Sequence, residues 1–142
     1  MAEVRQSVLV PYPAARMFEL VDAVELYPQF LPWCSAAEVA YRRPDALQAD
    51  VHINFRGIRQ KFTTRNSRNP PHEIRMQLVE GPFSMLEGCW RFTELGAGSK
   101  VEFELRWAFS SRVLGAIAGP VFNHIANTMV DAFVKRAQAL HG

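Results

Sequence analysis

Arginine and lysine residues form the most concentrated group of potentially functional side chains in the chain. Between Arg42 and Arg75 lie eight arginine and lysine residues and three carboxylates, a local charge of +5 in a chain of net charge +2. Strand alternation is expected to gather five of these cations into one patch: Arg56, Arg59, Lys61, Arg65 and Arg75. Such a patch suits RNA phosphates or an anionic membrane surface, and a solvated face is the competing interpretation.

Groups that usually carry catalysis or bind metals are scattered. The four histidines lack metal-ligand spacing and are predicted to face solvent: His52, His72, His124 and His141. Cys34 and Cys89 have no histidine neighbour in sequence and are expected to be reduced thiols. Glu94, near a strand end, is the one carboxylate that alternation can place on an apolar face. We therefore expect no catalytic residue, metal or cofactor, and no enzyme.

Length and composition are those of an ordinary globular domain. The chain has 142 residues, of which 49% are hydrophobic and 21% charged, and a chain of this size can bury about two-thirds of its unfolded surface. We expect one domain over residues 1–142. The first ten residues lack the features of a signal peptide, and no run reaches the roughly 18 to 20 apolar residues of a membrane span. A cytoplasmic location is therefore expected.

The spacing of apolar residues predicts the elements that position these groups. Residues 2–10 alternate as a strand, a short helix follows Pro13, and Val24 to Cys34 is expected to form a helical turn and a loop. Six more strand-like runs lie between residues 38 and 109, and residues 112–141 form a long amphipathic helix. Its apolar side is predicted to hold Ile117, Val121, Phe122, Ile125, Met129, Phe133 and Leu140. This order is typical of an α+β fold.

A curled sheet and a straight helix do not match in shape along their whole length. The predicted fold can therefore leave an apolar gap between them, in which Gln6, Gln60 and Asn127 are candidate polar groups. The segment Tyr27 to Cys34 holds four bulky apolar residues and two prolines, and is expected to cover one end of the sheet as a plug or an entrance lid. For each single side chain, core packing is the competing interpretation.

Four motifs resemble those of the bacterial ribosome association toxin (RatA) family: Tyr-Pro-Gln-Phe-Leu-Pro-Trp-Cys at 27–34, Phe-Thr-Thr-Arg-Asn at 62–66, Leu-Val-Glu-Gly-Pro-Phe at 78–83, and Leu-Glu-Gly-Cys-Trp-Arg-Phe at 86–92. The resemblance implies the helix-grip fold of the START-like, polyketide-cyclase-like superfamily. In that fold a curved antiparallel sheet of about seven strands wraps around a long C-terminal helix, short helices follow the first strand, and a hydrophobic tunnel lies between sheet and helix. Residues 27–34 and Phe83 would gate that tunnel.

The resemblance implies two functions. Related mitochondrial coenzyme-Q-binding START-domain proteins bind ubiquinone and support respiration, whereas the bacterial toxin binds the large ribosomal subunit and blocks subunit joining. The leading expectation is non-enzymatic binding of a ubiquinone-like molecule or another lipid by a set of inward-facing residues: Tyr27, Phe30, Leu31, Trp33, Phe55, Phe62, Met76, Leu78, Phe83, Trp90, Phe92, Phe122, Ile125 and Met129.

Two alternatives stay open beside ligand binding. One is contact with the large ribosomal subunit through the basic patch, and the other is an enzyme of the polyketide cyclase or aromatase kind, which would need inward ionisable groups that this sequence mostly lacks. An antitoxin partner and a peripheral contact with the inner membrane are also left open. DNA is not an expected partner.

Overall fold

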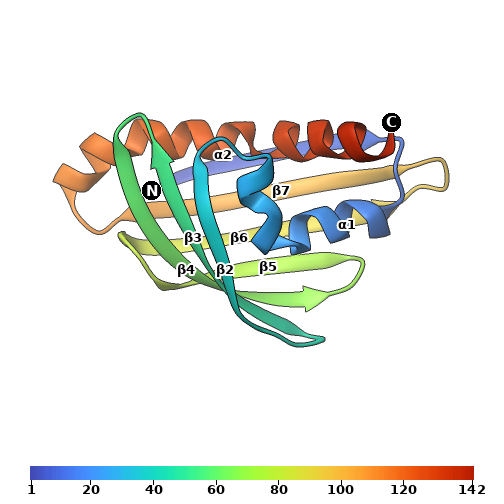
Figure 1. The fold of residues 1–142 in the computed structure, drawn as a ribbon, viewed down its shortest axis with the longest axis horizontal. Helices are drawn as coiled ribbons and strands as arrows, with labels where there is room; N and C mark the ends of the chain where they lie inside the picture. Colours follow the sequence, from blue (N-terminus) through green and yellow to red (C-terminus); the bar gives the residue numbers. More distant parts are fainter.

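Seven antiparallel strands form one curved sheet, and a 30-residue helix lies along it (Figure 1). The computed structural model describes residues 1–142. Its elements are β1 (Ala2–Val10), α1 (Ala14–Asp22), the 3-10 helix η1 (Val24–Gln29), β2 (Cys34–Arg42), β3 (Ala46–Phe55), β4 (Ile58–Asn69), β5 (Glu73–Glu80), β6 (Phe83–Glu94), β7 (Ser99–Phe109) and α2 (Arg112–His141). The predicted α+β order of elements is confirmed.

The sheet is a meander whose first strand is added at the far edge. Strands β2 to β7 pair in chain order, and β1 pairs with β7, which gives the order β1-β7-β6-β5-β4-β3-β2. The β3–β4 hairpin turns at Arg56 (φ 50°) and Gly57 (φ 82°), and two positive φ values in a two-residue loop suit the right-handed twist of the flanking strands. This turn fixes the register that places Phe55 opposite Ile58.

Helix α2 supplies the other half of the core. It lies beside β1 and β7 while β2, β3 and β4 curl across below it (Figure 1). Its buried face runs through Ala118, Val121, Phe122, Ile125, Ala126, Val130, Phe133 and Ala137. The helix passes through Pro120 without a break.

Two residues predicted on the apolar side of α2 lie in solvent. Ile117 is 58% exposed and Leu140 is 49% exposed. Alanines at 118, 126 and 137 form part of the buried face instead, and these small residues let the helix approach the sheet closely. By length and composition alone α2 could cross a membrane, but it is the core helix of this fold.

Glu94 lies outside the core and caps a helix. Its Oε2 accepts a hydrogen bond from the backbone N–H of Ala14 at 3.0 Å, which satisfies one free donor at the start of α1. The carboxylate also lies at the favourable end of the helix dipole. The one carboxylate predicted as a candidate for an apolar face therefore joins β6 to α1.

Candidate functional site

An apolar cavity lies between the inner face of the sheet and α2. Its volume is about 60 Å³, well below the roughly 300–1,000 Å³ of ordinary small-molecule pockets. Eight of the predicted ligand-binding residues line it: Tyr27, Trp33, Phe62, Met76, Trp90, Phe122, Ile125 and Met129. The predicted gap is therefore present, but side chains fill most of it.

The other six predicted ligand-binding residues lie elsewhere in the core or at its edge. Leu31 is 1% exposed, and Phe92 packs edge-on against Phe18 at 5.6 Å between ring centroids. Phe83 packs edge-on against Phe62 and Phe122 of the cavity wall but lines a second cavity of about 10 Å³. Phe30, Phe55 and Leu78 are only partly buried. Alternation identifies the face on which a residue lies, but not its depth along the curled strand.

Two polar residues of the cavity wall were missed by the sequence analysis. Thr64 and Asn66 on β4 are 5% and 7% exposed and line the cavity. The sequence pattern does indicate their position, because alternation from Phe62 places residues 62, 64 and 66 on one inward face of the strand. The Oδ1 atom of Asn66 has no hydrogen-bond partner, an arrangement that costs about 1–3 kcal/mol in a buried site.

The three polar residues that were expected in this cavity do not line it. Gln6 donates from Nε2 to the backbone carbonyl of Asn127 at 2.9 Å and so joins β1 to α2. The side chain of Asn127 is exposed and donates to the carbonyl of Asn123 at 2.8 Å. Gln60 lines the smaller second cavity. Asn66 and Thr64 are thus the polar groups of the main cavity.

The segment Tyr27 to Cys34 closes the cavity on one side. The hydroxyl of Tyr27 donates to the carbonyl of Val21 at 2.5 Å, and burial of the ring raises the pKa of Tyr27 above its ordinary value. Phe30 and Tyr27 each pack edge-on against Phe133 of α2. Arg136 donates to Gln29 at 3.0 Å. The segment therefore lies closed over one side of the cavity, a position that both a plug and an entrance lid would occupy.

A network of ion pairs holds the chain just before this segment against the sheet. Arg68 on β4 donates through Nε and Nη2 to the two carboxylate oxygens of Asp22 at 2.7 and 2.8 Å, and through Nη1 to the backbone carbonyls of Arg43 and Pro44. Arg42 bridges Asp22 and Glu25. The hydrogen bond to Asp22 raises the pKa of Arg68 above its ordinary value. The network joins the end of α1 and the start of η1 to β2 and β4.

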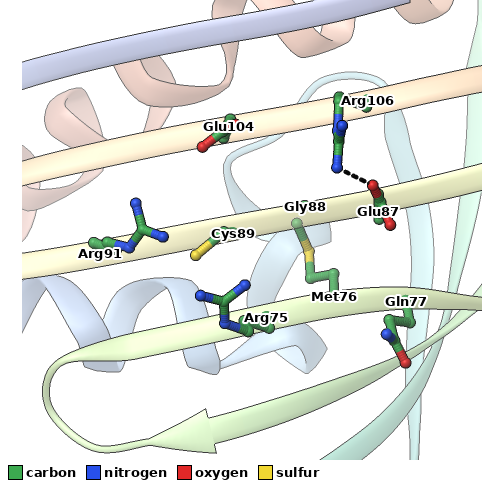
Figure 2. Close-up of a pocket in the computed structure, with 9 residues that line it drawn as sticks. All are labelled: Arg75, Met76, Gln77, Glu87, Gly88, Cys89, Arg91, Glu104 and Arg106. Atoms are coloured by element: carbon green, nitrogen blue, oxygen red, sulfur yellow. Dashed lines mark hydrogen bonds and ion pairs between the residues drawn. The ribbon is translucent and has the colours of Figure 1, made fainter. Parts of the chain in front are cut away.

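The outer face of β5, β6 and β7 carries a shallow pocket of about 230 Å³ around Cys89 (Figure 2). The guanidinium groups of Arg75 and Arg91 flank the thiol, and both arginines pair with Glu73, at 2.6 and 3.4 Å. Arg106 pairs with Glu87 in the same view. Each cation of this pocket is therefore matched by a carboxylate.

Both cysteines are free, buried thiols. Burial raises the pKa of Cys34 to about 11, and burial also raises the pKa of Cys89 despite the two neighbouring guanidinium groups. A thiol with a raised pKa is a poor nucleophile at neutral pH because little of it is thiolate.

Four cations on the β3–β4 hairpin differ from those around Cys89. Arg56, Arg59, Lys61 and Arg65, here called the basic row, are all exposed, and none of them forms an ion pair. Residues 59, 61 and 65 project from the outer side of β4, as predicted. Arg75, which was predicted to extend the same patch, is instead paired with Glu73 two residues away on the same face of its strand.

The β3 side chains beside the basic row include an amide, an imidazole and a carboxylate, and none of them forms an ion pair with it. Asn54 lies opposite Arg59 in the β3–β4 register, and His52 lies opposite Lys61. Asp50, between the cations, accepts a hydrogen bond from the Thr63 hydroxyl at 2.5 Å. The basic row therefore keeps its guanidinium and ammonium groups available for an external anion.

Comparison with known proteins identifies relatives across the whole chain. The family model for polyketide cyclase/dehydrase and lipid transport matches residues 10–134. The ribosome association toxin RatA of Pseudomonas aeruginosa is 41% identical over 140 residues, covering 98% of this chain and 97% of the relative. RatA of Escherichia coli K12 is 38% identical, covering 99% and 90%. The mitochondrial coenzyme Q-binding protein COQ10 homolog B of Xenopus laevis is 26% identical, covering 99% and 59%.

Solved structures share the same fold. A START superfamily protein from Mycobacterium smegmatis superposes with a TM-score of 0.80 at 21% identity, covering 97% of this chain and 98% of that one. The Zhui aromatase/cyclase from Streptomyces sp. R1128 superposes with a TM-score of 0.79 at 18% identity, covering 96% and 93%. These likenesses bear on the fold alone, which is the helix-grip architecture that the sequence motifs implied.

Proposed function

Because this chain belongs to the ribosome association toxin RatA family, within the polyketide cyclase/dehydrase and lipid transport group, we propose that it associates with the ribosome, through its large subunit. The contact surface is the basic row on the β3–β4 hairpin. Association is a binding function that needs no catalytic group, and it places the protein in the cytoplasm.

The observation that carries this proposal is the absence of ion pairs in the basic row. Cations already matched to carboxylates gain little from a phosphate, because an existing partner must first be lost. Four exposed, unmatched cations on one hairpin can instead neutralise phosphates and release the counterions condensed on RNA. Thirteen of the sixteen cations in the chain are arginine, whose planar group suits phosphate oxygens.

Sedimentation with separated ribosomal subunits tests the proposal. The purified protein is expected to travel with the large subunit in a density gradient at low salt and to be released as salt increases. Migration with the small subunit alone, or at the top of the gradient in all conditions, would contradict it.

The apolar cavity supports a second function, the binding of a hydrophobic molecule, which we propose for the space between the sheet and α2. Flexible methionines at positions 76 and 129 form part of the wall and can rotate to enlarge it. At about 60 Å³ the cavity admits only a small apolar group as it stands. A ubiquinone-like molecule or another lipid would require the segment Tyr27 to Cys34 to open.

Fluorobenzene is a suitable probe of this second function because it is small and apolar. With methionine methyl groups labelled by ¹³C, its addition is expected to shift the Met76 and Met129 signals and to leave exposed Met1 unchanged. Ile125→Phe fills the cavity and should abolish the shifts, whereas Ile117→Phe makes the same change on the exposed side of α2 and should keep them. If the Met76 and Met129 signals still shift in Ile125→Phe, fluorobenzene binds outside this cavity.

A further inference from the structure

The solvent-facing side of helix α2 changes from apolar to polar along its length. In the second half of the helix this side carries Asp131 and Lys135, which form an exposed ion pair at 3.0 Å, as is usual for a surface helix. About five turns earlier, the same side holds Val113 and Ile117, which are 70% and 58% exposed. Together with exposed Pro120, one turn further on, these two residues form the apolar strip of α2.

The core of the protein does not account for the apolar strip. The buried face of α2 runs through Ala118, Phe122 and Ile125, on the other side of the helix. Single apolar residues scattered over a surface are normal, whereas bulky ones on successive turns of one helix are typical of a contact with a protein or a membrane. Figure 1 shows that the first turns of α2 project past the end of the sheet, so the strip is accessible.

Arginines lie at both ends of the apolar strip. Arg112 is exposed and directly precedes Val113. At the other end the β3–β4 hairpin meets the helix, because the ring of Phe55 stacks on His124 with the centroids 5.5 Å apart. The guanidinium of Arg56 lies 4.9 Å from the centroid of the same phenylalanine ring. Neither arginine forms an ion pair, so both are free to bind an anion.

Carboxylates are few around the strip. Helix α2 has none between Arg112 and Val130. At the adjoining ends of the strands, Glu3 on β1 is paired with Arg5, and Glu80 ends β5. A bilayer that contains anionic lipids complements this arrangement, because apolar side chains enter the boundary between headgroups and acyl chains while arginines bind lipid phosphates.

We propose that this end of the molecule binds the surface of a membrane that contains anionic lipids. Val113 and Ile117 enter the acyl boundary, and Arg56 and Arg112 bind headgroup phosphates. Two apolar side chains bury little surface, so the contact is reversible and depends on the apolar strip and the arginines together. Of these residues only Arg56 also belongs to the basic row.

Sedimentation with lipid vesicles tests the role of charge. The full chain is expected to bind vesicles of phosphatidylcholine mixed with phosphatidylglycerol, which is anionic. Binding to vesicles of pure phosphatidylcholine should be about 20-fold weaker or more, because each of the two arginines contributes about fivefold near an anionic surface.

A pair of double variants isolates the apolar strip. Val113→Gln with Ile117→Gln keeps the net charge and the helix, since glutamine is a good helix former, and should weaken binding to anionic vesicles by about tenfold or more. Leu9→Gln with Leu95→Gln is the matched control. These leucines are likewise 70% and 55% exposed, but they lie at the opposite end of the sheet, near the β6–β7 turn, so binding should be unchanged.

The outcomes separate a membrane from the other partners of such a strip. Equal binding to the two kinds of vesicle, or equal weakening in the two double variants, would overturn the proposal. A wild-type dimer that Val113→Gln with Ile117→Gln converts to a monomer would show that a second copy of the chain covers the strip. If this variant loses association with large ribosomal subunits, the strip belongs to the ribosome contact and the membrane proposal is wrong. Loss of vesicle binding with unchanged sedimentation on subunits supports the membrane contact and leaves the ribosome proposal intact.

Discussion

Replacing Arg59 and Arg65 together by glutamate is expected to weaken association with the large ribosomal subunit by about 100-fold or more, because two phosphate contacts become two repulsions. The substitutions change the net charge from +2 to −2. Both side chains are exposed and form no ion pair, so the free energy of unfolding should change by less than about 0.5 kcal/mol. Sedimentation with large subunits measures the binding, and thermal unfolding measures the stability.

A second double variant separates local contact from overall charge. Arg16→Glu with Arg112→Glu makes the same change in net charge at two exposed arginines outside the basic row. Long-range attraction to RNA would fall equally in both double variants, whereas contact through the basic row would be lost only in the first. Equal weakening in the two proteins would show that the basic row is not the contact surface.

Replacing Arg68 by alanine is expected to lower the free energy of unfolding by about 2–3 kcal/mol, because the mostly buried carboxylate of Asp22 loses two charge-assisted hydrogen bonds and keeps only its ion pair with Arg42. The side chains of Arg68 and Asp22 are each 12% exposed, and their two hydrogen bonds are 2.7 and 2.8 Å long. Two backbone carbonyls, of Arg43 and Pro44, also lose their donor. Urea denaturation followed by tryptophan fluorescence measures the effect, since buried Trp33 and Trp90 report on the core.

Arg75→Ala is the matched control for the Arg68 prediction. Arg75 also forms a short ion pair, with Glu73, but its side chain is 56% exposed. An ion pair in solvent contributes little to stability, because water and salt screen the attraction and ordering the side chains opposes it, so Arg75→Ala should destabilise the protein much less than Arg68→Ala. Comparable destabilisation by the two substitutions would mean that burial of the Arg68–Asp22 pair is not what makes it stabilising.

The elements and their inward faces could be predicted from the sequence because they depend on spacing alone. The alternation of Val101, Phe103, Leu105 and Trp107 matches the buried face of β7 residue by residue. The same rule applied to β4 would have placed Asn66 beside Phe62 in the cavity wall. The residue type gives no sign of this burial, because asparagine is depleted in strands and is mostly exposed in folded proteins.

The size of the cavity and most of the ion pairs could not be predicted from the spacing of residues in the sequence. The volume between sheet and helix depends on how aromatic rings such as Trp90, Phe122 and Phe133 interlock, and the spacing of apolar residues contains no information on rotamers. Asp22 and Arg68 are 46 residues apart, so their pairing follows from the curl of the sheet. The Glu73–Arg75 pair was visible in the sequence, because residues two apart on a strand share a face.

The salt dependence of binding tests most directly whether the basic row contacts ribosomal phosphates. If all four cations contact phosphates, the logarithm of the association constant for the large subunit should fall with the logarithm of salt concentration with a slope of about −3 to −4. Arg59→Gln with Arg65→Gln removes two charges at nearly constant size and should reduce this slope by about half. A wild-type slope near zero, or a slope that the two substitutions leave unchanged, would contradict ribosome association through this surface.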